Sequence, residues 1–160
     1  MLQIKRLLQS IARASHIQLE FDAIPHYQLK GDPTKFQQII VNIIMNAIDS
    51  YKDVASDGLL NHVRISCRAN NTSIVIEVHD WGVGIPADKL HKIFDTFYST
   101  KGAPKYGLGI GLAIVKQHVH QDFHGSIYVC SSSRYGTCFR IHLPGTPFPP
   151  RHLRSRQINR

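Results

Sequence analysis

Cysteine is scarce in this chain, and its pattern argues against a disulfide scaffold. The 160 residues contain three cysteines, Cys67, Cys130 and Cys138, with no CxxC pair among them. Any disulfide would leave one thiol over, which fits a reducing compartment better than secretion, where small folds rely on even sets of bridges. We therefore interpret the three cysteines as ordinary strand residues.

Long apolar runs are also missing. The most hydrophobic stretch, residues 39–48, is interrupted by Asn42 and Asn46, so no segment reaches the roughly 18 apolar residues of a membrane-spanning helix. The N-terminal residues MLQIKRLLQS lack the apolar segment and the small-residue cleavage site of a signal peptide. We expect this fragment not to insert in a membrane and to lie in the cytoplasm, either free or as the cytoplasmic part of a membrane-bound sensor.

Acidic residues are absent from the C-terminal end. The last ten residues, RHLRSRQINR, hold four arginines and no acid, and without them 15 basic and 11 acidic residues remain of a chain whose formal charge is +8. No nucleic-acid-binding motif accompanies this charge, so we do not expect nucleic acid as a partner. The pattern predicts one domain over residues 1–146, followed by a basic, disordered tail over residues 147–160.

Hydrophobic periodicity predicts an α/β fold. Apolar spacing indicates a helix over residues 2–14, a long helix that begins at Asp32-Pro33, and a third helix over residues 112–121. Alternation indicates five strands and a short hairpin partner at residues 27–29 for the first of them. The strands cover residues 17–21, 62–67, 73–79, 126–131 and 137–143. Such alternation favours a sheet with helices on one face and water on the other.

A polar row interrupts the long second helix. Asn42, Asn46 and Asp49 stand four and three residues apart, so they lie along one face of that helix. Amide oxygens are hard ligands that suit Mg²⁺, which keeps several waters and bridges to phosphate oxygens. Two core amides with hydrogen-bond partners are the alternative interpretation, and the row alone does not decide between them.

The segment DWGVGIP, residues 80–86, directly follows a predicted apolar strand. Asp80 stands where the strand ends, so its carboxylate can accept a hydrogen bond from an exocyclic amino group. Gly82 and Gly84 let the backbone approach a flat ring or turn tightly where a Cβ would clash. A tight turn with an aspartate cap is the competing interpretation.

A second glycine-rich segment, GLGIGL at residues 107–112, runs into the third predicted helix. Amide groups at a helix N-terminus bind phosphate, and glycine permits a close approach. The segment is not a dinucleotide-binding fingerprint, because a loop precedes it and no βαβ unit surrounds it. The P-loop pattern GxxxxGK[ST] is absent from the sequence as well.

The order of these motifs resembles the catalytic ATP-binding domain of sensor histidine kinases, within the fold shared with gyrase, the 90-kilodalton heat-shock chaperone and the mismatch-repair ATPase. The matching segments are NIIMNA at 42–47, DWGVGIP at 80–86, KIFDTFYSTK at 92–101 and GLGIGLAIVK at 107–116. The resemblance covers residues 1–144. It implies a two-layer α/β sandwich, in which helices cover one face of a mixed, largely antiparallel sheet, with a mobile ATP lid over about residues 99–106.

The resemblance also implies how Mg-ATP is held. Asn46 would bind Mg²⁺ with Asn42 close to the metal and phosphates, and Asp80 would accept a hydrogen bond from the adenine amino group. Gly82 and Gly84 would shape the adenine pocket. Phe94 and Phe97 would pack at the base of the lid, and either lid lysine could supply positive charge to the phosphates. The other expected ATP-binding residues are Asp49, Ile85, Lys101, Lys105, Gly107, Leu108, Gly109, Ile110, Gly111 and Leu112.

One position separates the branches of this fold. The hydrolysing relatives carry a glutamate one turn before the metal-binding asparagine, where Asn42 stands here, and an amide is no general base. The resemblance therefore implies transfer of the γ-phosphoryl group to a histidine on a separate dimerisation hairpin of the same full-length kinase, with a response regulator or receiver domain downstream. None of the ten histidines fits the phosphoacceptor motif. A nucleotide sensor without phosphotransfer and an ATP-hydrolysing relative stay open as alternatives.

Overall fold

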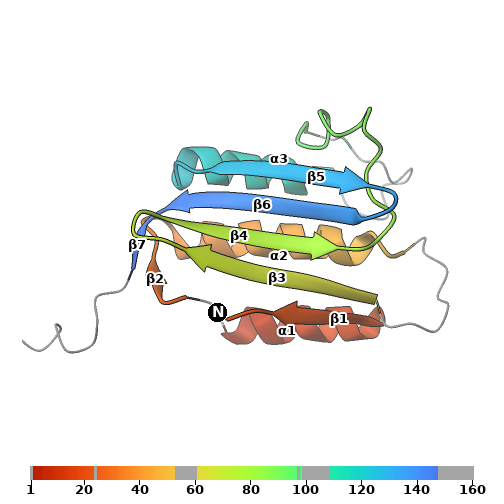
Figure 1. Ribbon diagram of the computed structural model, residues 1–160, viewed down its shortest axis with the longest axis horizontal. Helices are drawn as coiled ribbons and strands as arrows, with labels where there is room; N and C mark the ends of the chain where they lie inside the picture. The colour runs from red at the N-terminus through yellow and green to blue at the C-terminus, as the bar shows by residue number, and fades with distance from the viewer. Residues whose placement is uncertain (1, 24, 53–60, 97, 99–108, 148–160) are drawn as a thin grey trace, which may run out of the picture.

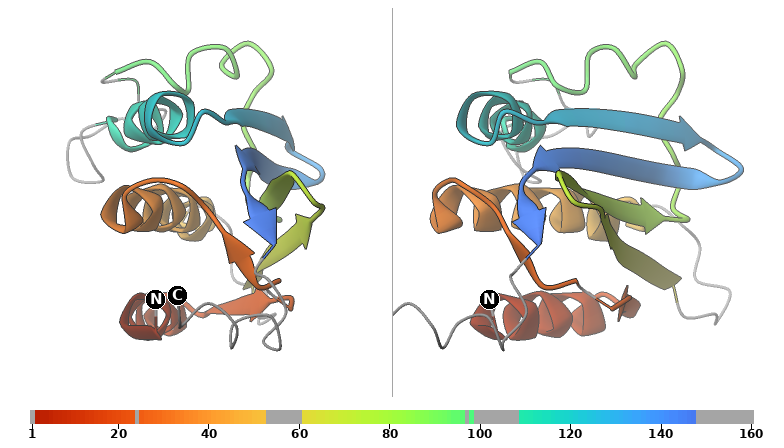
Figure 2. Two further views of the ribbon diagram at one scale, coloured as in Figure 1. Left: turned by 90° about the vertical axis from the view of Figure 1, so that its left-hand side faces the viewer. Right: turned by 60° about the vertical axis from the view of Figure 1, so that its left-hand side comes forward.

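The computed structural model describes residues 2–23, 25–52, 61–96, 98 and 109–147, with the side chains of residues 2–5 left out. Helices form one layer and a sheet forms the other (Figures 1 and 2). The helical layer contains α1 (Leu2–Ala14), α2 (Pro33–Asp49) and α3 (Gly111–Gln117), which continues as a π-helix, η2 (His118–Asp122). Within the described ranges, no helix combines the length and apolar character needed to cross a membrane.

The main sheet has five strands in the order β1-β3-β4-β6-β5. Strand β1 runs parallel to β3, and the three other neighbouring pairs are antiparallel. This confirms the expected two-layer sandwich with a mixed, largely antiparallel sheet covered on one face by helices. The strands are β1 (Ile17–Phe21), β3 (Asn61–Ala69), β4 (Ser73–Asp80), β5 (Ser126–Ser132) and β6 (Gly136–Pro144).

The predicted hairpin between residues 17–21 and 27–29 is wrong. Strand β2 (Tyr27–Gln28) pairs instead with β7 (Thr146–Pro147), antiparallel and apart from the main sheet. Alternation identifies a strand but not its partner, and this partner lies at the far end of the described chain. Pro147, which the sequence places in the tail, thus pairs with Tyr27; the domain boundary itself stays a prediction.

Helix α2 is the centre of the core because its apolar face is continuous. Asp32 caps its first turn by accepting a hydrogen bond from the Thr34 N–H at 2.7 Å, and Pro33 occupies its first position. The buried residues of the helix are Ile39, Ile43, Ile44, Ala47 and Ile48. They pack on the inward side chains of the sheet, which include Val63, Ile76, Val78, Ile141 and Leu143.

The third helix changes character within its predicted range of 112–121. It is α-helical to Gln117 and then adopts the wider π-helical turn of η2. Asp122 explains how this segment is anchored, since it pairs with Lys35 of α2 at 2.5 Å and with the His118 Nδ1 at 2.8 Å. The contact with Lys35, together with that of the His118 Nε2 with the Gln38 side chain at 3.1 Å, holds η2 against the N-terminal half of α2.

Candidate functional site

Asp80 ends β4 with its side chain inside the protein. The residue is 2% exposed, and its Oδ1 accepts hydrogen bonds from the Gly82 N–H at 3.0 Å and from the Ser50 hydroxyl at 2.9 Å. Burial raises the pKa of Asp80, while hydrogen bonds from Gly82, Ser50 and the Thr137 backbone act in the opposite direction. The structure therefore provides a fixed, shielded hydrogen-bond acceptor at the end of a central strand.

Ser50 connects the end of α2 to the loop that follows β4. Its backbone carbonyl accepts the Val83 N–H at 3.3 Å, so both its side chain and its main chain contact this loop. A Cβ on Gly82 would come within 2.0 Å of the Ser50 Oγ, which explains the glycine. Sequence reasoning missed Ser50, because its place at the helix end indicates only a cap and not a contact 30 residues away.

Tyr51 holds the same loop from its other side. Its hydroxyl donates to the His62 carbonyl at 2.6 Å and accepts from the Trp81 N–H at 2.7 Å. The Trp81 ring packs on His79 and His62, with centroids 4.0 and 4.2 Å away. The backbone around Asp80 is thus held in place by the two residues that directly follow α2.

The far end of the loop rests on the β5–β6 hairpin. The Ile85 N–H donates to the Ser131 Oγ at 2.7 Å. Gly84 has a φ of +70°, and a Cβ there would lie 2.3 Å from the Ser132 carbonyl oxygen, so only glycine is compatible with this turn. Ser131 is a second supporting residue that no local sequence signal reveals.

The polar row of α2 divides into three separate environments. The Asn42 Nδ2 donates to the Gly111 carbonyl at 3.3 Å, which connects α2 to the start of α3. Asp49 pairs with Lys52 at 2.7 Å. Asn46 is half-buried, and its amide has no hydrogen-bond partner among the residues that the structure describes. Within the described part of the chain, Asn46 is therefore the member of this row that is available to a ligand.

The start of α3 lies beside this row. Gly109 adopts a φ of +67°, and Ile110 is the N-cap residue, with no side-chain cap hydrogen bond among the described contacts. A Cβ on Gly111 would lie 3.6 Å from the Asn42 Cγ, so the protein itself leaves room there. Leu112 packs against the core. The first amides of α3 thus lie next to Asn42 on α2.

Five of the expected ATP-binding residues lie outside the described residues. They are Phe97, Lys101, Lys105, Gly107 and Leu108, and their roles stay predictions. Phe94, expected at the base of the lid, packs edge-on against Phe139 with centroids 6.5 Å apart, and the Lys116 ammonium lies 5.8 Å from its ring. The expected lid, at about residues 99–106, lies outside the described residues, so the role of Phe94 at its base stays a prediction.

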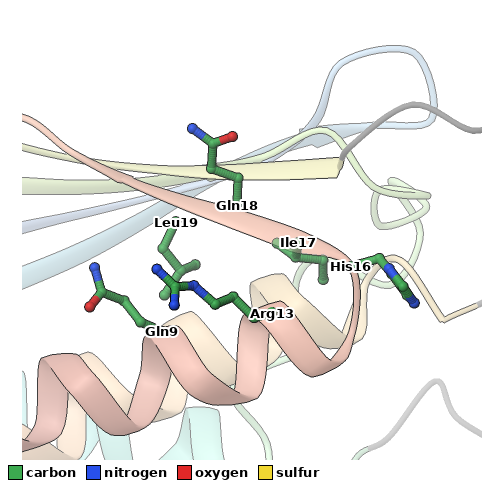
Figure 3. Close-up of a pocket in the computed structure, with 6 residues that line it drawn as sticks. All are labelled: Gln9, Arg13, His16, Ile17, Gln18 and Leu19. Atoms are coloured by element: carbon green, nitrogen blue, oxygen red, sulfur yellow. The ribbon is translucent and has the colours of Figure 1, made fainter.

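Two cavities lined by described residues lie away from Asp80. One, of about 450 Å³, lies between α1 and the outer edge of β1, where Gln9 and Arg13 approach Leu19 while Gln18 points away (Figure 3). The other, of about 300 Å³, is lined by Arg64, Glu77 and neighbours on the sheet. The residues that line these two cavities do not include Asp80 or the polar row. The hydrogen-bonded Asp80 carboxylate, and not either of these cavities, marks the candidate site.

A metal site in this region would depend on few protein ligands. Among the described residues, no group of three or more His, Cys, Asp or Glu side chains could hold a metal ion. The Asn46 amide nevertheless fits Mg²⁺, since it is half-buried and has no partner in the described chain, and a magnesium bound with phosphates needs few protein ligands.

Comparison with known proteins agrees with this geometry. The family described as "Histidine kinase-, DNA gyrase B-, and HSP90-like ATPase" matches residues 31–147. The sensor histidine kinase TmoS of Ectopseudomonas mendocina is 34% identical over 123 residues, which are 77% of this chain and 12% of that protein. The sensor-like histidine kinase SenX3 of Mycolicibacterium smegmatis is 34% identical over 149 residues, 91% of this chain and 37% of that protein.

Solved structures lead to the same family. The mycobacterial sensor histidine kinase MprB superposes with a TM-score of 0.73 at 28% identity, over 91% of this chain and 93% of that one. This chain spans only 12% and 37% of the lengths of TmoS and SenX3, and so corresponds to one part of such proteins. It belongs to the histidine kinase-, DNA gyrase B- and HSP90-like ATPase family, as an ATPase domain of the kind found in sensor histidine kinases.

Proposed function

We propose that this chain binds Mg-ATP between α2, the loop after β4 and the start of α3, and donates the γ-phosphoryl group to a histidine on a separate dimerisation and phosphoacceptor hairpin. The observation that carries the proposal is the Asp80 carboxylate, which is 2% exposed and hydrogen-bonded to Ser50 and Gly82. Adenine recognition needs an acceptor of this kind, shielded from competing water.

The number of donors around Asp80 supports adenine binding. A carboxylate offers about four lone-pair sites, and three protein groups donate to this one: Ser50, Gly82 and the Thr137 backbone. One site is left for a further donor, and the exocyclic amino group of adenine is such a donor. Gly82 and Gly84 keep the neighbouring backbone free of side chains, which lets a flat ring approach it.

The phosphate end would be held by α2 and α3. The Asn46 amide has no hydrogen-bond partner among the described residues, so its oxygen is available to Mg²⁺. One turn earlier on α2, the Asn42 amide donates to the Gly111 carbonyl. Bound Mg²⁺ would neutralise charge on the phosphate oxygens. The amides of residues 109–112, together with Lys101 or Lys105, would contact the phosphates, while Asp49, Ile85, Phe97 and Leu108 would complete the nucleotide contacts.

Phosphotransfer is favoured over hydrolysis by the environment of Asn42. Its amide donates to the Gly111 carbonyl and cannot remove a proton from water. The chain's own residues would therefore position the nucleotide and neutralise its charge, and the histidine hairpin of the same kinase would supply the nucleophile. A response regulator or receiver domain would then accept the phosphoryl group. We expect the reaction in the cytoplasm.

The decisive experiment mixes this chain with the histidine-bearing hairpin of the same kinase and ATP radiolabelled at the γ-phosphate. We expect label on the hairpin and none when its histidine is replaced by alanine. Binding of ATP without labelling of the hairpin would instead support a nucleotide sensor. Rapid phosphate release by the isolated chain, lost in Asn46→Ala, would support a hydrolysing ATPase.

A further inference from the structure

Two of the three cysteines face each other across neighbouring strands. Cys130 of β5 and Cys138 of β6 are direct register partners in the antiparallel pair, which Figure 1 shows side by side. Opposite residues of an antiparallel pair have Cα atoms about 4.5 to 5.5 Å apart, within the range of about 4.4 to 6.8 Å that a disulfide spans. Both thiols are free.

The pair lies on the sheet face opposite the helices. In β6 the inward residues Phe139 and Ile141 are buried, and Cys138 alternates with them, so it points the other way. Cys130 is exposed and Cys138 is half-buried. Cys67 packs against the core and lies on β3, which β4 separates from β6 and β5. Reagents in solution therefore reach Cys130 first.

We propose that Cys130 and Cys138 form a redox-active dithiol site that reacts with low-molecular-weight disulfides to give an intramolecular cross-strand disulfide. The Cys130 thiolate attacks one sulfur of glutathione disulfide and expels one glutathione thiol, which takes up the proton. The Cys138 thiolate then attacks the Cys130 sulfur and expels the second glutathione. The protein loses two electrons and two protons, and the disulfide reagent gains them.

The accessibility of the two thiols sets this order of attack. Burial raises the pKa of Cys138, and the charge of Glu77 acts in the same direction, with Arg140 opposing them. The Cys138 thiolate is therefore less populated in the resting protein than that of an ordinary cysteine. Exposed Cys130 has direct access to the reagent, and Cys138 needs only to reach a sulfur on the next strand. Cys138 is thus suited to resolve the mixed disulfide.

The position of the pair connects it to the loop of the candidate site. Ser131, next to Cys130, accepts the Ile85 N–H, and Thr137, next to Cys138, donates to Asp80 through its backbone. The Ser131 and Thr137 hydroxyls are 2.9 Å apart. The Cβ atoms of a disulfide lie about 3.5 to 4.5 Å apart, whereas those of opposite residues start at about 4.5 to 5.5 Å. Oxidation therefore shifts the two strands that support this loop.

The connection between the disulfide and the loop after β4 rests on the proposed function, because its effect is measured as nucleotide affinity. We expect the oxidised chain to bind ATP at least threefold more weakly than the reduced chain, and dithiothreitol to restore the affinity. By linkage, bound ATP must then slow oxidation of the pair. Neither effect requires phosphotransfer.

The test exposes the full chain to glutathione disulfide and examines it by mass spectrometry without reduction. We expect the loss of two hydrogen atoms and a peptide that joins Cys130 to Cys138. Cys130→Ser, at an exposed position that tolerates the change, should show no such species, and Cys67→Ala should behave as the unaltered chain. Stable glutathione adducts, disulfide-linked dimers or pairing with Cys67 would each overturn the proposal.

A second measurement separates this inference from the proposed function. Reduced and oxidised chains are titrated with ATP alongside Cys130→Ser treated in the same way. An intact disulfide with unchanged ATP affinity would overturn the connection to the loop. A reduced chain that binds no ATP would instead overturn the proposed function. Mass spectrometry would still decide whether the two thiols form a disulfide.

Discussion

The Ser50 hydroxyl lies 2.9 Å from the Asp80 carboxylate and joins the end of α2 to the end of β4 across 30 residues of sequence. Ser50 is one of the groups that oppose the rise in the pKa of Asp80 caused by burial. The charge state of the proposed adenine acceptor thus depends on a helix end that itself needs no contact with the nucleotide.

Replacing Ser50 with alanine should raise the pKa of Asp80 further, because a donor to the charged form is lost. ATP affinity should then start to fall at a higher pH as the pH is lowered. The loss of a hydrogen bond to a buried carboxylate should also cost about 1 to 2 kcal/mol of stability. Titration with a fluorescent nucleotide at a series of pH values from about 4 to 8 measures this shift in the pH dependence of affinity. An unchanged pH profile would contradict this role.

Asp80→Asn should weaken ATP binding at least about tenfold, because the amide nitrogen cannot accept the donors that the carboxylate accepts. Stability should change with pH in a defined direction. The pKa of Asp80 in the folded protein lies above its value in the unfolded chain. The free energy of unfolding of the unaltered chain therefore falls as pH rises from the unfolded pKa through the folded pKa. The variant should lack that slope in chemical denaturation.

Asp22→Asn is the matched control for this substitution. Asp22 is an exposed carboxylate that pairs with Arg64 at 3.1 Å, outside the proposed site. Its replacement should leave ATP affinity within about twofold, since exposed ion pairs contribute little. Equal losses of affinity in both variants would show that Asp80 has no specific role in binding.

Asn46→Ala should remove the magnesium dependence of nucleotide binding. We expect the variant to bind ATP with the same affinity in the presence and absence of Mg²⁺, because the protein ligand is missing. Calorimetric titration with and without EDTA measures this. Gln37→Ala, earlier on the same helix, should keep the dependence on magnesium. A magnesium effect that survives in Asn46→Ala would assign the metal to other residues.

The same substitution at two glycines should separate a folding effect from a binding effect. In Gly82→Ala the new Cβ would lie 2.0 Å from the Ser50 Oγ, whereas in Gly111→Ala it would lie 3.6 Å from Asn42. Gly82→Ala should therefore lower the melting temperature, and Gly111→Ala should leave it unchanged while weakening ATP binding. Thermal denaturation with and without ATP measures both. A stable Gly82→Ala variant would contradict the close contact with Ser50.

Tyr51→Phe should destabilise the protein by about 1 to 3 kcal/mol, because the His62 carbonyl and the Trp81 N–H both lose their partner. The loop after β4 should also protect its amides less well in hydrogen exchange. Tyr128→Phe, at an exposed position, is the control and should change neither quantity. Similar stability of the two variants would show that Tyr51 acts only by packing.

Local pattern was enough to place most elements. Apolar periodicity predicts α1, the Asp32-Pro33 pair predicts the start of α2, and strict alternation predicts the inward faces of β3 and β4. These features depend on residues close in sequence, so the chain determines them by itself. The family was inferred from four motifs in a fixed order, and the mixed sheet was inferred from the resemblance to that family.

Only the tertiary structure decided which distant residues meet. The pairing of β2 with β7, the contact of Ser50 with Asp80, and the register of Cys130 with Cys138 all join segments that no local period connects. The sequence by itself indicated Asp80 and the asparagine row as candidate nucleotide-binding residues. Packing around α2 decided how Asp80 is held, because hydrogen bonds form wherever the folded chain brings donors and acceptors together.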